Sequence, residues 1–472
     1  MVLNGDLAWL VGEIAAGAHI VIALGVTVHV LLNKRNIGTS ISWMGIAWLS
    51  PFVGATLYFA LGINRVKRRA KRLWRARMPV EIGAIEPTGM TSPDSLTPLE
   101  YAIGRLTGLK STAGNDARIL RNGDEAYPVM LAAIDAAQKS VGLCSYIFRD
   151  DMAGRPFIDA LIRAHERGVK VRVLIDGIGG GYLWSGTYLA LKKAGVPVDR
   201  FLHSYWPWRT PFLNLRNHRK VMVVDGRLAF VGGLNIGDEN VLASKPDHPV
   251  RDVHFRVEGP VVEQLVESFA DDWLFEVGET LSDEEWFPPL GPVGTYEARA
   301  IPSGPDEDLE QIEFVALHAI SCARHSIRIV TPYFLPPDVL TTALGLAAMR
   351  GLYVDIVIPE HSNHAVLDWA RRVPLRLLLE AGCRVWLRQG PFEHSKLMTI
   401  DEKWTMIGSA NWDIRSFRLN FELNVEVQGP EFAAQIDTLV RTTRPLELAE
   451  LAADSVPLRL RNAAARLLTP YL

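Results

Sequence analysis

The pattern of hydrophobic and polar positions begins with two long apolar stretches near the N-terminus. Ile14–Leu32 and Trp43–Ile63 span 19 and 21 residues and contain no Asp, Glu, Lys or Arg. A helix rises about 1.5 Å per residue, so about 20 such residues cross a hydrocarbon core. The pattern therefore predicts a two-helix transmembrane hairpin within residues 1–64, with its turn at Asn33–Ser40. Because Pro51 interrupts the second stretch, a shallow re-entrant pair is the alternative.

The rest of the chain repeats one pattern of apolar runs and helix-length segments. KSVGLCSYIF at 139–148 matches HSIRIVTPYF at 325–334, and the helix–glycine–strand segments 156–176 and 339–359 follow in the same order. Strands that alternate with helices of this length indicate βαβ units. We therefore predict an α/β fold in which two similar halves, with mixed and mainly parallel sheets, form an internal pseudo-dimer.

Stretches rich in turn-forming residues separate these regions. Residues 78–115 are rich in Pro, Gly, Ser and Thr and predict a linker with one short helix, and a similar stretch at 282–310 separates the two halves. The predicted segments are the hairpin at 1–64, a basic collar and linker at 65–115, and the two halves at 116–285 and 286–472.

Composition and charge sharpen this division. The mean hydropathy of +0.10 comes largely from residues 14–63, and three cysteines exclude a disulfide scaffold. The net charge of −3 combines a neutral segment at 1–64, eight positive charges at 65–77 and −11 in the remainder. The positive-inside rule places the basic collar and Met1 in the cytoplasm, and the collar attracts anionic lipid. An acidic body argues against a nucleic-acid partner.

Each half contains one His-x-Lys motif. In both halves an Asp follows the Lys, an Asn follows that Asp by ten residues, and small residues precede the Asn. Residues i and i+2 of a strand share a face, so His and Lys project together and the returning strand brings the Asn beside them. One such motif has little specificity, whereas two in register within a repeat are specific. The two sets are His218, Lys220, Asp225, Gly233 and Asn235, and His394, Lys396, Asp401, Ser409 and Asn411.

These residue types suit chemistry at a phosphate. One copy supplies an imidazole, a fixed cation and an amide or hydroxyl donor, which match a tetrahedral phosphate with developing negative charge. Two copies that meet at a pseudo-two-fold axis place two imidazoles across one phosphate. One imidazole attacks phosphorus and the other protonates the leaving alkoxide, while the lysines and asparagines hold the other oxygens. The lysines supply the charge, so we expect neither a metal nor another cofactor.

The paired motifs resemble those of the phospholipase D superfamily over residues 115–450. Together with the hairpin, collar and linker, the chain resembles the bacterial cardiolipin synthases of that superfamily. The resemblance implies a covalent phosphatidyl-histidine whose phosphatidyl group passes to an alcohol. It assigns the nucleophile to His218 and the general acid and base to His394, although the near-symmetry of the halves leaves the order open.

The resemblance also implies roles for several carboxylates. Asp225 and Asp401 would orient the histidines or tie the lysines, and Glu422 would support the second site. In the first half, Asp252 lies near the corresponding place. The stretch at 204–217 either lines an acyl entrance or is a packed connector; its large apolar residues are Trp206, Trp208, Phe212 and Leu213.

The implied reaction condenses two phosphatidylglycerols into cardiolipin and glycerol. It would take place at the inner, cytoplasmic membrane of a bacterium, with the catalytic halves facing the cytoplasm and anionic lipid as partner. The alternatives are a phospholipase D that hydrolyses phospholipids, a nuclease of the same superfamily and an inactive membrane scaffold. Whether the acceptor is phosphatidylglycerol or phosphatidylethanolamine, and whether the chain forms a homo-oligomer, stays open.

Overall fold

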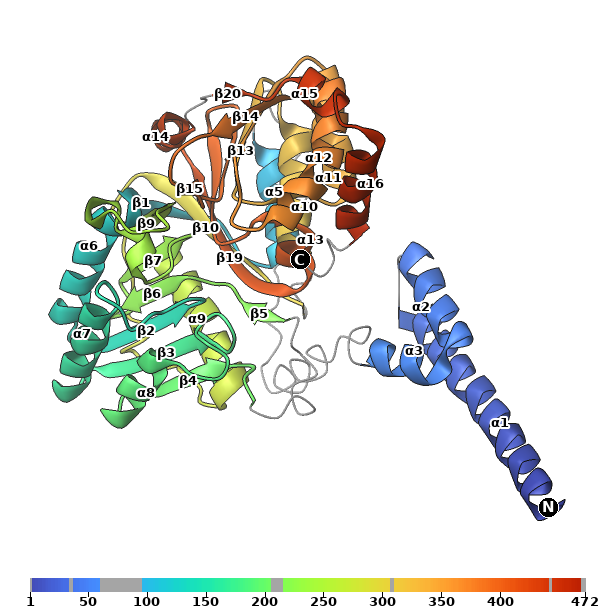
Figure 1. Ribbon diagram of the computed structural model, residues 1–472. Coiled ribbons are helices and arrows are strands. Elements are labelled where there is room, and N and C mark those ends of the chain that lie inside the picture. The colour runs from blue at the N-terminus through green and yellow to red at the C-terminus, as the bar shows by residue number, and fades with distance from the viewer. Residues whose placement is uncertain are drawn as a thin grey trace. The chain divides into compact units, whose positions relative to one another are not determined.

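The computed structural model divides the chain into two compact units (Figure 1). The residues up to 59 form a helical unit, and the residues from 96 onward form the catalytic body, which contains both halves of the repeat. The predicted basic collar at 65–77, the first part of the linker at 78–95 and the aromatic stretch at 205–214 lie outside the described residues. The structure describes residues 2–33, 37–59, 96–204, 215–305, 310–440 and 444–467.

The N-terminal unit consists of helices α1 (Val2–Asn33), α2 (Ile37–Leu49) and α3 (Pro51–Leu57). Within α1, the 22-residue segment Gly12–Asn33 is long and apolar enough to cross a membrane, and no other described helix is. This helix supports the predicted first span. One buried cluster joins α1 to the other helices of the unit, and it consists of Val26, Val30, Trp43, Ala47 and Tyr58.

The second apolar run does not form one continuous helix. Ser50 has φ −149° and ψ 81°, outside the helical region, and Pro51 starts a new helix. The proline ring clashes with the carbonyl four residues earlier and removes an N–H donor, which accounts for the break. A Cβ on Gly54 would lie 2.6 Å from the carbonyl oxygen of Ile46, so α3 folds back closely on α2. The predicted hairpin is therefore supported for its first helix only, and the predicted turn is helical again from Ile37 onward.

The catalytic body is built on one mixed sheet. The strands of the first half are β1 (Thr112–Arg121), β2 (Ser140–Ser145), β3 (Lys170–Asp176), β4 (Val198–Phe201), β6 (Val221–Val224), β7 (Leu228–Gly232) and β9 (Val253–Glu258). The strands of the second half are β10 (Tyr296–Ser303), β11 (Ser326–Val330), β13 (Tyr353–Pro359), β14 (Arg384–Arg388), β16 (Leu397–Ile400), β17 (Trp404–Gly408), β19 (Asn420–Gln428) and β20 (Arg444–Pro445).

The order of these strands repeats on both sides of a central pair. They are arranged β4-β3-β2-β6-β7-β9-β1-β10-β19-β17-β16-β11-β13-β14-β20, and β1 pairs with β10 in the antiparallel sense. Among the long strands, parallel pairing occurs in β2-β3-β4 and in β11-β13-β14, where helices connect successive strands as the βαβ pattern predicts. The strands between them are antiparallel. Several two-residue strands also pair in the parallel sense.

The predicted α/β fold of two similar halves with mixed sheets is confirmed. Among the described strands, however, antiparallel pairs outnumber the parallel ones that were expected to dominate, because the hairpin after each motif and the central strands pair in the antiparallel sense.

Helices occupy matching places in the two halves. Helices α7 (Arg155–Glu166) and α11 (Asp338–Met349) are each followed two residues later by a glycine, Gly168 and Gly351, whose φ angles of +86° and +94° glycine adopts without strain. The first half contains α6 (Asn122–Ala136), α7 (Arg155–Glu166), α8 (Gly186–Lys193) and α9 (Val261–Val277). The second half contains α10 (Gln311–Cys322), α11 (Asp338–Met349), α12 (Ala365–Glu380), α13 (Ile414–Arg418), α14 (Pro430–Leu439), α15 (Leu448–Ala452) and α16 (Val456–Leu467), and α5 (Thr97–Thr107) is the short helix predicted in the linker.

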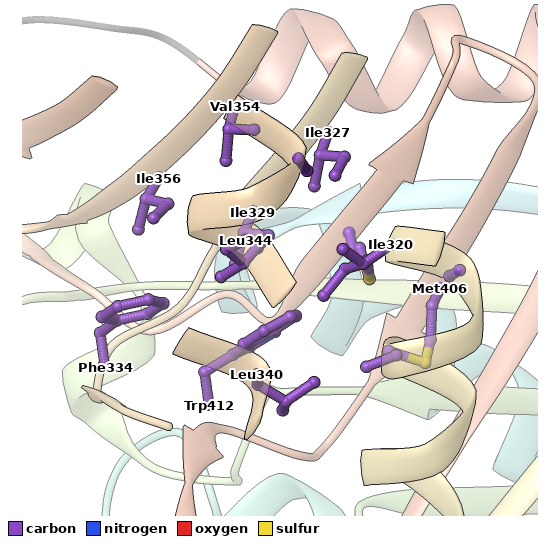
Figure 2. Packing of buried hydrophobic residues seen from close by; sticks show 14 of the residues in the cluster. Ile320, Ile327, Ile329, Phe334, Leu340, Leu344, Val354, Ile356, Met406 and Trp412 are labelled. Carbon is purple, nitrogen blue, oxygen red and sulfur yellow. The ribbon is translucent and has the colours of Figure 1, made fainter. Parts of the chain in front are cut away.

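The core of the second half shows why these segments pack together (Figure 2). Every second residue of β11 and β13 is an apolar side chain on one face of the sheet, and residues four apart on α11 meet them. This packed core occupies the space between the sheet and the helices. The polar motif residues lie outside it, at the ends of the strands. The buried residues of this cluster include Ile327, Ile329, Leu340, Leu344, Val354 and Ile356.

Candidate active site

The two motif segments come directly before equivalent strands of the two halves. His218 and Lys220 directly precede β6, and His394 and Lys396 directly precede β16. The prediction that they lie within strands is therefore wrong by a few residues, although the side chains of each pair still project together. Lys220 Nζ donates to the carbonyl oxygen of His218 at 2.7 Å, and Lys396 bonds the carbonyl oxygen of His394 in the same way.

Each motif segment is attached to the other half of the molecule. The two-residue strand β5 (Arg216–Asn217) pairs with β19 of the second half, and the His218 N–H donates to the carbonyl oxygen of Phe421 at 2.9 Å. In the same manner β15 (Phe392–Glu393) pairs with β8 (Val250–Arg251) of the first half, and the His394 N–H donates to the carbonyl oxygen of Arg251 at 2.7 Å. These reciprocal pairings bring both motifs to one site.

The carboxylates that orient the histidines also cross between the halves. His218 Nδ1 lies 3.0 Å from a Glu422 oxygen, and His394 Nδ1 lies 2.6 Å from Asp252 Oδ2. The expectation that Glu422 supports the second-half histidine is therefore wrong, because β19 carries Glu422 toward the first-half motif. In each pair the bond to Nδ1 leaves Nε2 for the substrate.

Alternate side chains of the first motif segment face in opposite directions. Asn217 Nδ2 and Arg219 Nη1 both donate to Asp272, at 2.8 and 2.9 Å. The alternate residues face the opposite way, where the Tyr146 ring lies 4.9 Å from the His218 ring and 5.1 Å from Lys220 Nζ. The even positions of this segment therefore carry the His and Lys side chains to the shared site, and the odd positions fix the segment to the body.

Burial dominates the electrostatics of the histidines. Burial lowers the pKa of His218 to about 4, while the nearby Glu422 carboxylate opposes the shift. Burial and then the charge of Lys396 lower the pKa of His394 to about 4, because Lys396 Nζ lies 2.8 Å from His394 Nδ1. Each lysine acts on the histidine of the other half as well, as expected for one shared site. Both imidazoles are neutral near pH 7.

The two lysines are buried cations whose charge is costly without a ligand. Burial lowers the pKa of Lys220 to about 7 and the pKa of Lys396 to about 8, although Glu422 and Asp252 raise both values. Lys396 Nζ lies 3.9 Å from Asp252 Oδ2, which is the closest carboxylate contact of either lysine in the described residues. An anionic phosphate between the lysines would stabilise their charged forms.

The aspartates of the motifs lie away from the histidines and have another role. Asp225 accepts hydrogen bonds from the backbone N–H groups of Gln138, Lys139 and Ser140 at 2.7 to 3.2 Å. Asp401 accepts the corresponding bonds ahead of β11 at 2.7 to 2.9 Å. The prediction that these aspartates orient histidines or tie lysines is wrong, because a strand separates them from the motif. They fix the loops that enter β2 and β11.

The remaining predicted residues line the returning strand ends. Asn235 Oδ1 accepts from the Ile147 N–H at 3.2 Å, so its Nδ2 amide is the group available to a ligand. The buried Asn411 Oδ1 has no hydrogen-bond partner in the described part of the chain. Ser409 Oγ donates to Glu422 at 2.6 Å, so it serves the carboxylate rather than the phosphate. A Cβ on Gly233 would lie 2.4 Å from Asp252 Oδ1.

Sequence reasoning left Asp252 out of the predicted site and assigned Glu422 to the other histidine. The pairing of each carboxylate depends on how the halves dock, which the motif spacing does not contain. The signal that could have found it is positional, because Asp252 and Glu422 both lie at the start of the strand that follows the motif hairpin. Among the described residues, no three His, Cys, Asp or Glu side chains are placed to bind one metal ion.

Comparisons with known proteins agree with this geometry. The family model for the cardiolipin synthase, phospholipase D-like domain matches residues 130–273 and 316–442, one segment in each half. The major cardiolipin synthase of Bacillus subtilis is 31% identical over 460 residues, which are 93% of this chain and 95% of that protein. Cardiolipin synthase A of Pseudomonas syringae is 32% identical over 465 residues, 95% of this chain and 96% of that protein.

A solved structure shows the same fold. The phosphatidylserine synthase of Haemophilus influenzae superposes with a TM-score of 0.62 at 16% identity, over 79% of this chain and 100% of that one. At this identity the likeness concerns the fold alone. The agreement covers the catalytic body that positions the two motifs.

Proposed function

Because the chain belongs to the bacterial cardiolipin synthases with phospholipase D-like domains, we propose that it transfers a phosphatidyl group from one phosphatidylglycerol to another. The products are cardiolipin and glycerol. The chain is an enzyme of the cardiolipin synthase type and is membrane-associated. The observation that carries the proposal is the composite site, in which the buried His218 and the largely buried His394, whose side chain is 12% exposed, are each held by a carboxylate of the other half beside two buried lysines.

In the first step, His218 Nε2 attacks the phosphorus of the donor lipid. The P–N bond forms while the P–O bond to glycerol breaks, and His394 gives its proton to the departing glycerol oxygen. His218 is neutral and therefore nucleophilic at pH 7, because burial lowers its pKa to about 4. His394 gains its proton when the substrate binds, since the adjacent phosphate and Asp252 both stabilise the imidazolium.

In the second step, the hydroxyl of the acceptor lipid attacks the phosphatidyl-histidine. His394 takes the hydroxyl proton, the new P–O bond forms and the P–N bond to His218 breaks, which restores the enzyme. One phosphodiester replaces another, so the exchange needs no nucleotide. Lys220 and Lys396, together with Asn235 and Asn411, hold the oxygens that stay on phosphorus.

We also propose how the chain is arranged at the membrane. Helix α1 anchors it, and the eight positive charges at 65–77 keep the catalytic halves on the cytoplasmic side of a bacterial inner membrane. A multi-pass topology would require the α2–α3 pair to enter the bilayer with α1. The proposed segments stay at 1–64, 65–115, 116–285 and 286–472, with phosphatidylglycerol and anionic lipid as partners, no nucleic acid and no cofactor.

The test is an assay of the full-length protein, purified in detergent, with phosphatidylglycerol as sole lipid. The proposal predicts cardiolipin and glycerol in equal amounts, measured by mass spectrometry and an enzymatic glycerol assay. The control is the double variant with His218→Ala and His394→Ala, which removes both imidazoles. Release of phosphatidic acid without cardiolipin would identify a phospholipase D hydrolase instead and would overturn the synthase proposal.

A further inference from the structure

An exposed apolar loop follows β3 in the first half. Residues 177–185, GIGGGYLWS, contain no charged side chain, yet the side chains of Leu183 and Trp184 are each 76% exposed. The loop is held in place on both sides of its tip. The Gly179 N–H donates to Asp176 Oδ1 at 2.8 Å, and Arg200 Nη2 donates to the Tyr182 carbonyl oxygen at 2.9 Å. The exposure of the two apolar side chains therefore belongs to an anchored loop.

This loop lies beside the first catalytic histidine. A Cβ on Gly179 would come within 2.7 Å of the Tyr146 ring, so the loop backbone packs directly on that tyrosine. The Tyr146 ring in turn lies 4.9 Å from the His218 ring. One aromatic side chain thus separates the loop from the histidine that we propose as nucleophile.

Helix α16 exposes a second apolar surface, in the second half. Val456, Leu460 and Leu467 are 66%, 66% and 78% exposed. At about 100° per residue these three positions fall on one face of the helix, opposite the buried Ala465. Ordinary surface helices turn their apolar stripe inward, so an outward apolar stripe marks a contact surface. The helix carries three arginines and no acidic residue.

Helix α16 is connected to the second catalytic histidine. Its Ala465 packs in one cluster with Leu335, and Tyr333 packs against that cluster. The Tyr333 ring lies 6.0 Å from the Phe392 ring, which lies 5.9 Å from the His394 ring. Figure 1 shows α16 beside α12 at the surface of the body. Both catalytic histidines are therefore linked through aromatic side chains to an element that exposes apolar residues.

We propose that the loop 177–185 and the outer face of α16 contact the surface of a phospholipid bilayer and open the catalytic site toward it. The inference rests on the proposed function, because the substrates are bilayer lipids. Tryptophan and leucine on an uncharged loop suit the interfacial region. On α16, Arg461 lies over Trp369 and Arg466 pairs with Asp338, so Arg459 is the arginine of this helix that we assign to an anionic headgroup. This contact is separate from the α1 anchor, and it lets a lipid headgroup reach the histidines without leaving the membrane.

The test uses the full-length protein in vesicles of phosphatidylcholine with phosphatidylglycerol. An environment-sensitive fluorophore is attached to a single cysteine introduced by Trp184→Cys or Leu460→Cys, with Cys322→Ser because Cys144 and Cys383 are buried. Lys139→Cys is the control. Lys139 precedes β2, whereas the loop follows the neighbouring parallel strand β3. The two therefore lie at opposite ends of these strands.

We expect blue-shifted emission and quenching by lipids with brominated acyl chains at positions 184 and 460, and neither effect at 139. Emission from 184 and 460 that stays as aqueous as that from 139 would overturn the inference. A blue shift that needs no lipid and grows with protein concentration would also overturn the inference, because it would identify a second copy of the chain as the occupant. These readouts report contact whether or not cardiolipin forms, so they separate this inference from the proposed function.

A second pair of variants gives a functional readout. Trp184→Asp should lower the ratio of the rate on vesicles to the rate on short-chain monomeric phosphatidylglycerol on the order of tenfold, whereas Trp184→Phe should preserve it. An Asp variant whose ratio equals that of the Phe variant would contradict a role for the loop at the bilayer.

Discussion

The two histidines that we propose as catalytic occupy equivalent positions in the repeat, yet their carboxylates differ. Glu422, which orients His218, also accepts from Ser409 Oγ at 2.6 Å and from Asn420 Nδ2 at 3.1 Å. Asp252, which orients His394, accepts from the Val253 N–H at 2.8 Å and packs against Gly233 in the place of that serine. Glu422 thus accepts more hydrogen bonds than Asp252, whereas Asp252 has the charge of Lys396 3.9 Å away.

This difference indicates how two histidines in equivalent positions can take different chemical roles. A carboxylate that already satisfies several donors stabilises an imidazolium less than one with fewer donors. In the free enzyme the pKa of both histidines is lowered to about 4, and the charge of Lys396 opposes protonation of His394. A bound phosphate would offset the charge of Lys396, so that Asp252 can then stabilise the imidazolium of His394. We infer that the difference between the Glu422 and Asp252 carboxylates, rather than the motifs, sets the two roles.

The largest effect should come from removing either imidazole. His218→Ala or His394→Ala should lower the rate of cardiolipin formation by about 10³-fold or more, because each removes a group that reacts directly. The rate is measured by mass spectrometry with phosphatidylglycerol as substrate. Thermal unfolding of each variant controls for misfolding. A folded variant that keeps a tenth of the activity would show that its histidine does not react.

The next largest effect should separate the two carboxylates. Asp252→Asn should lower the rate on the order of 10²-fold or more, since an amide cannot stabilise the imidazolium of His394. Glu422→Gln should lower the rate by a smaller factor, because Ser409 and Asn420 already donate hydrogen bonds to the Glu422 carboxylate. Equal losses in the two variants would argue that the histidines do not differ in proton transfer.

Asp225→Asn is the matched control for these carboxylates. The structure predicts nearly unchanged activity per folded molecule and a free energy of unfolding lower by about 1–2 kcal/mol, because charge-assisted bonds to three backbone N–H groups weaken. Asparagine tolerates the φ of +51° at this position, so the variant should fold. A loss of activity comparable to that of Asp252→Asn would restore the motif aspartate to the catalytic site.

These carboxylates also show where prediction from sequence succeeds. The repeat, the βαβ units and both His-x-Lys pairs follow from periodicity and spacing, which are local. The partners of His218 and His394 lie 204 and 142 residues away and come from the opposite half, so they depend on docking. The motif aspartates were misassigned because adjacency along the sequence does not imply adjacency across the length of a strand.

The N-terminal unit shows a second limit. Hydropathy predicts an apolar segment but does not determine whether it is one helix, and the break at Pro51 depends on local backbone geometry. The close contact of Gly54 with Ile46 is likewise visible only once the helices pack.

A smaller effect should come from exchanging the residues that differ between the halves. Gly233→Ala should lower activity on the order of tenfold, because its Cβ would displace the Asp252 carboxylate from His394. Ser409→Gly, which makes the second half resemble the first, should cost only a few-fold by removing one hydrogen bond to Glu422. Steady-state rates of both variants, with unfolding temperatures as controls, test this. A larger loss for Ser409→Gly would reverse the comparison.

The smallest effect is a pH dependence of up to about tenfold per unit at the limbs of the profile. Burial lowers the pKa of Lys220 to about 7 and that of Lys396 to about 8, and each lysine is cationic only below its pKa. Phosphate binding requires charged lysines, and His394 must take up a proton when the substrate binds although its pKa in the free enzyme is about 4. We therefore expect kcat/KM to decline above about pH 4 and to fall more steeply as the pH rises through 7 to 8. It should also fall below about 4, where His218 becomes protonated.

The two kinetic parameters should differ at the alkaline limb. Bound phosphate stabilises the charged lysines, so the limb of kcat should lie at higher pH than that of kcat/KM. Lys220→Arg should shift the limb of kcat/KM upward, since arginine stays charged. An alkaline limb that is identical in both parameters and unmoved by this variant would contradict a phosphate-binding role for the lysines.

The most direct test of the division of labour is a rapid-quench experiment with phosphatidylglycerol labelled in its phosphatidyl group. The account predicts an acid-labile, alkali-stable phosphatidyl-histidine at His218, identified by peptide mass spectrometry in the wild type and in His394→Ala, and no labelled protein in His218→Ala. Label on His394 in the His218→Ala variant would contradict the assignment of the nucleophile to His218. The absence of label from the wild type and from every variant would contradict the covalent mechanism itself.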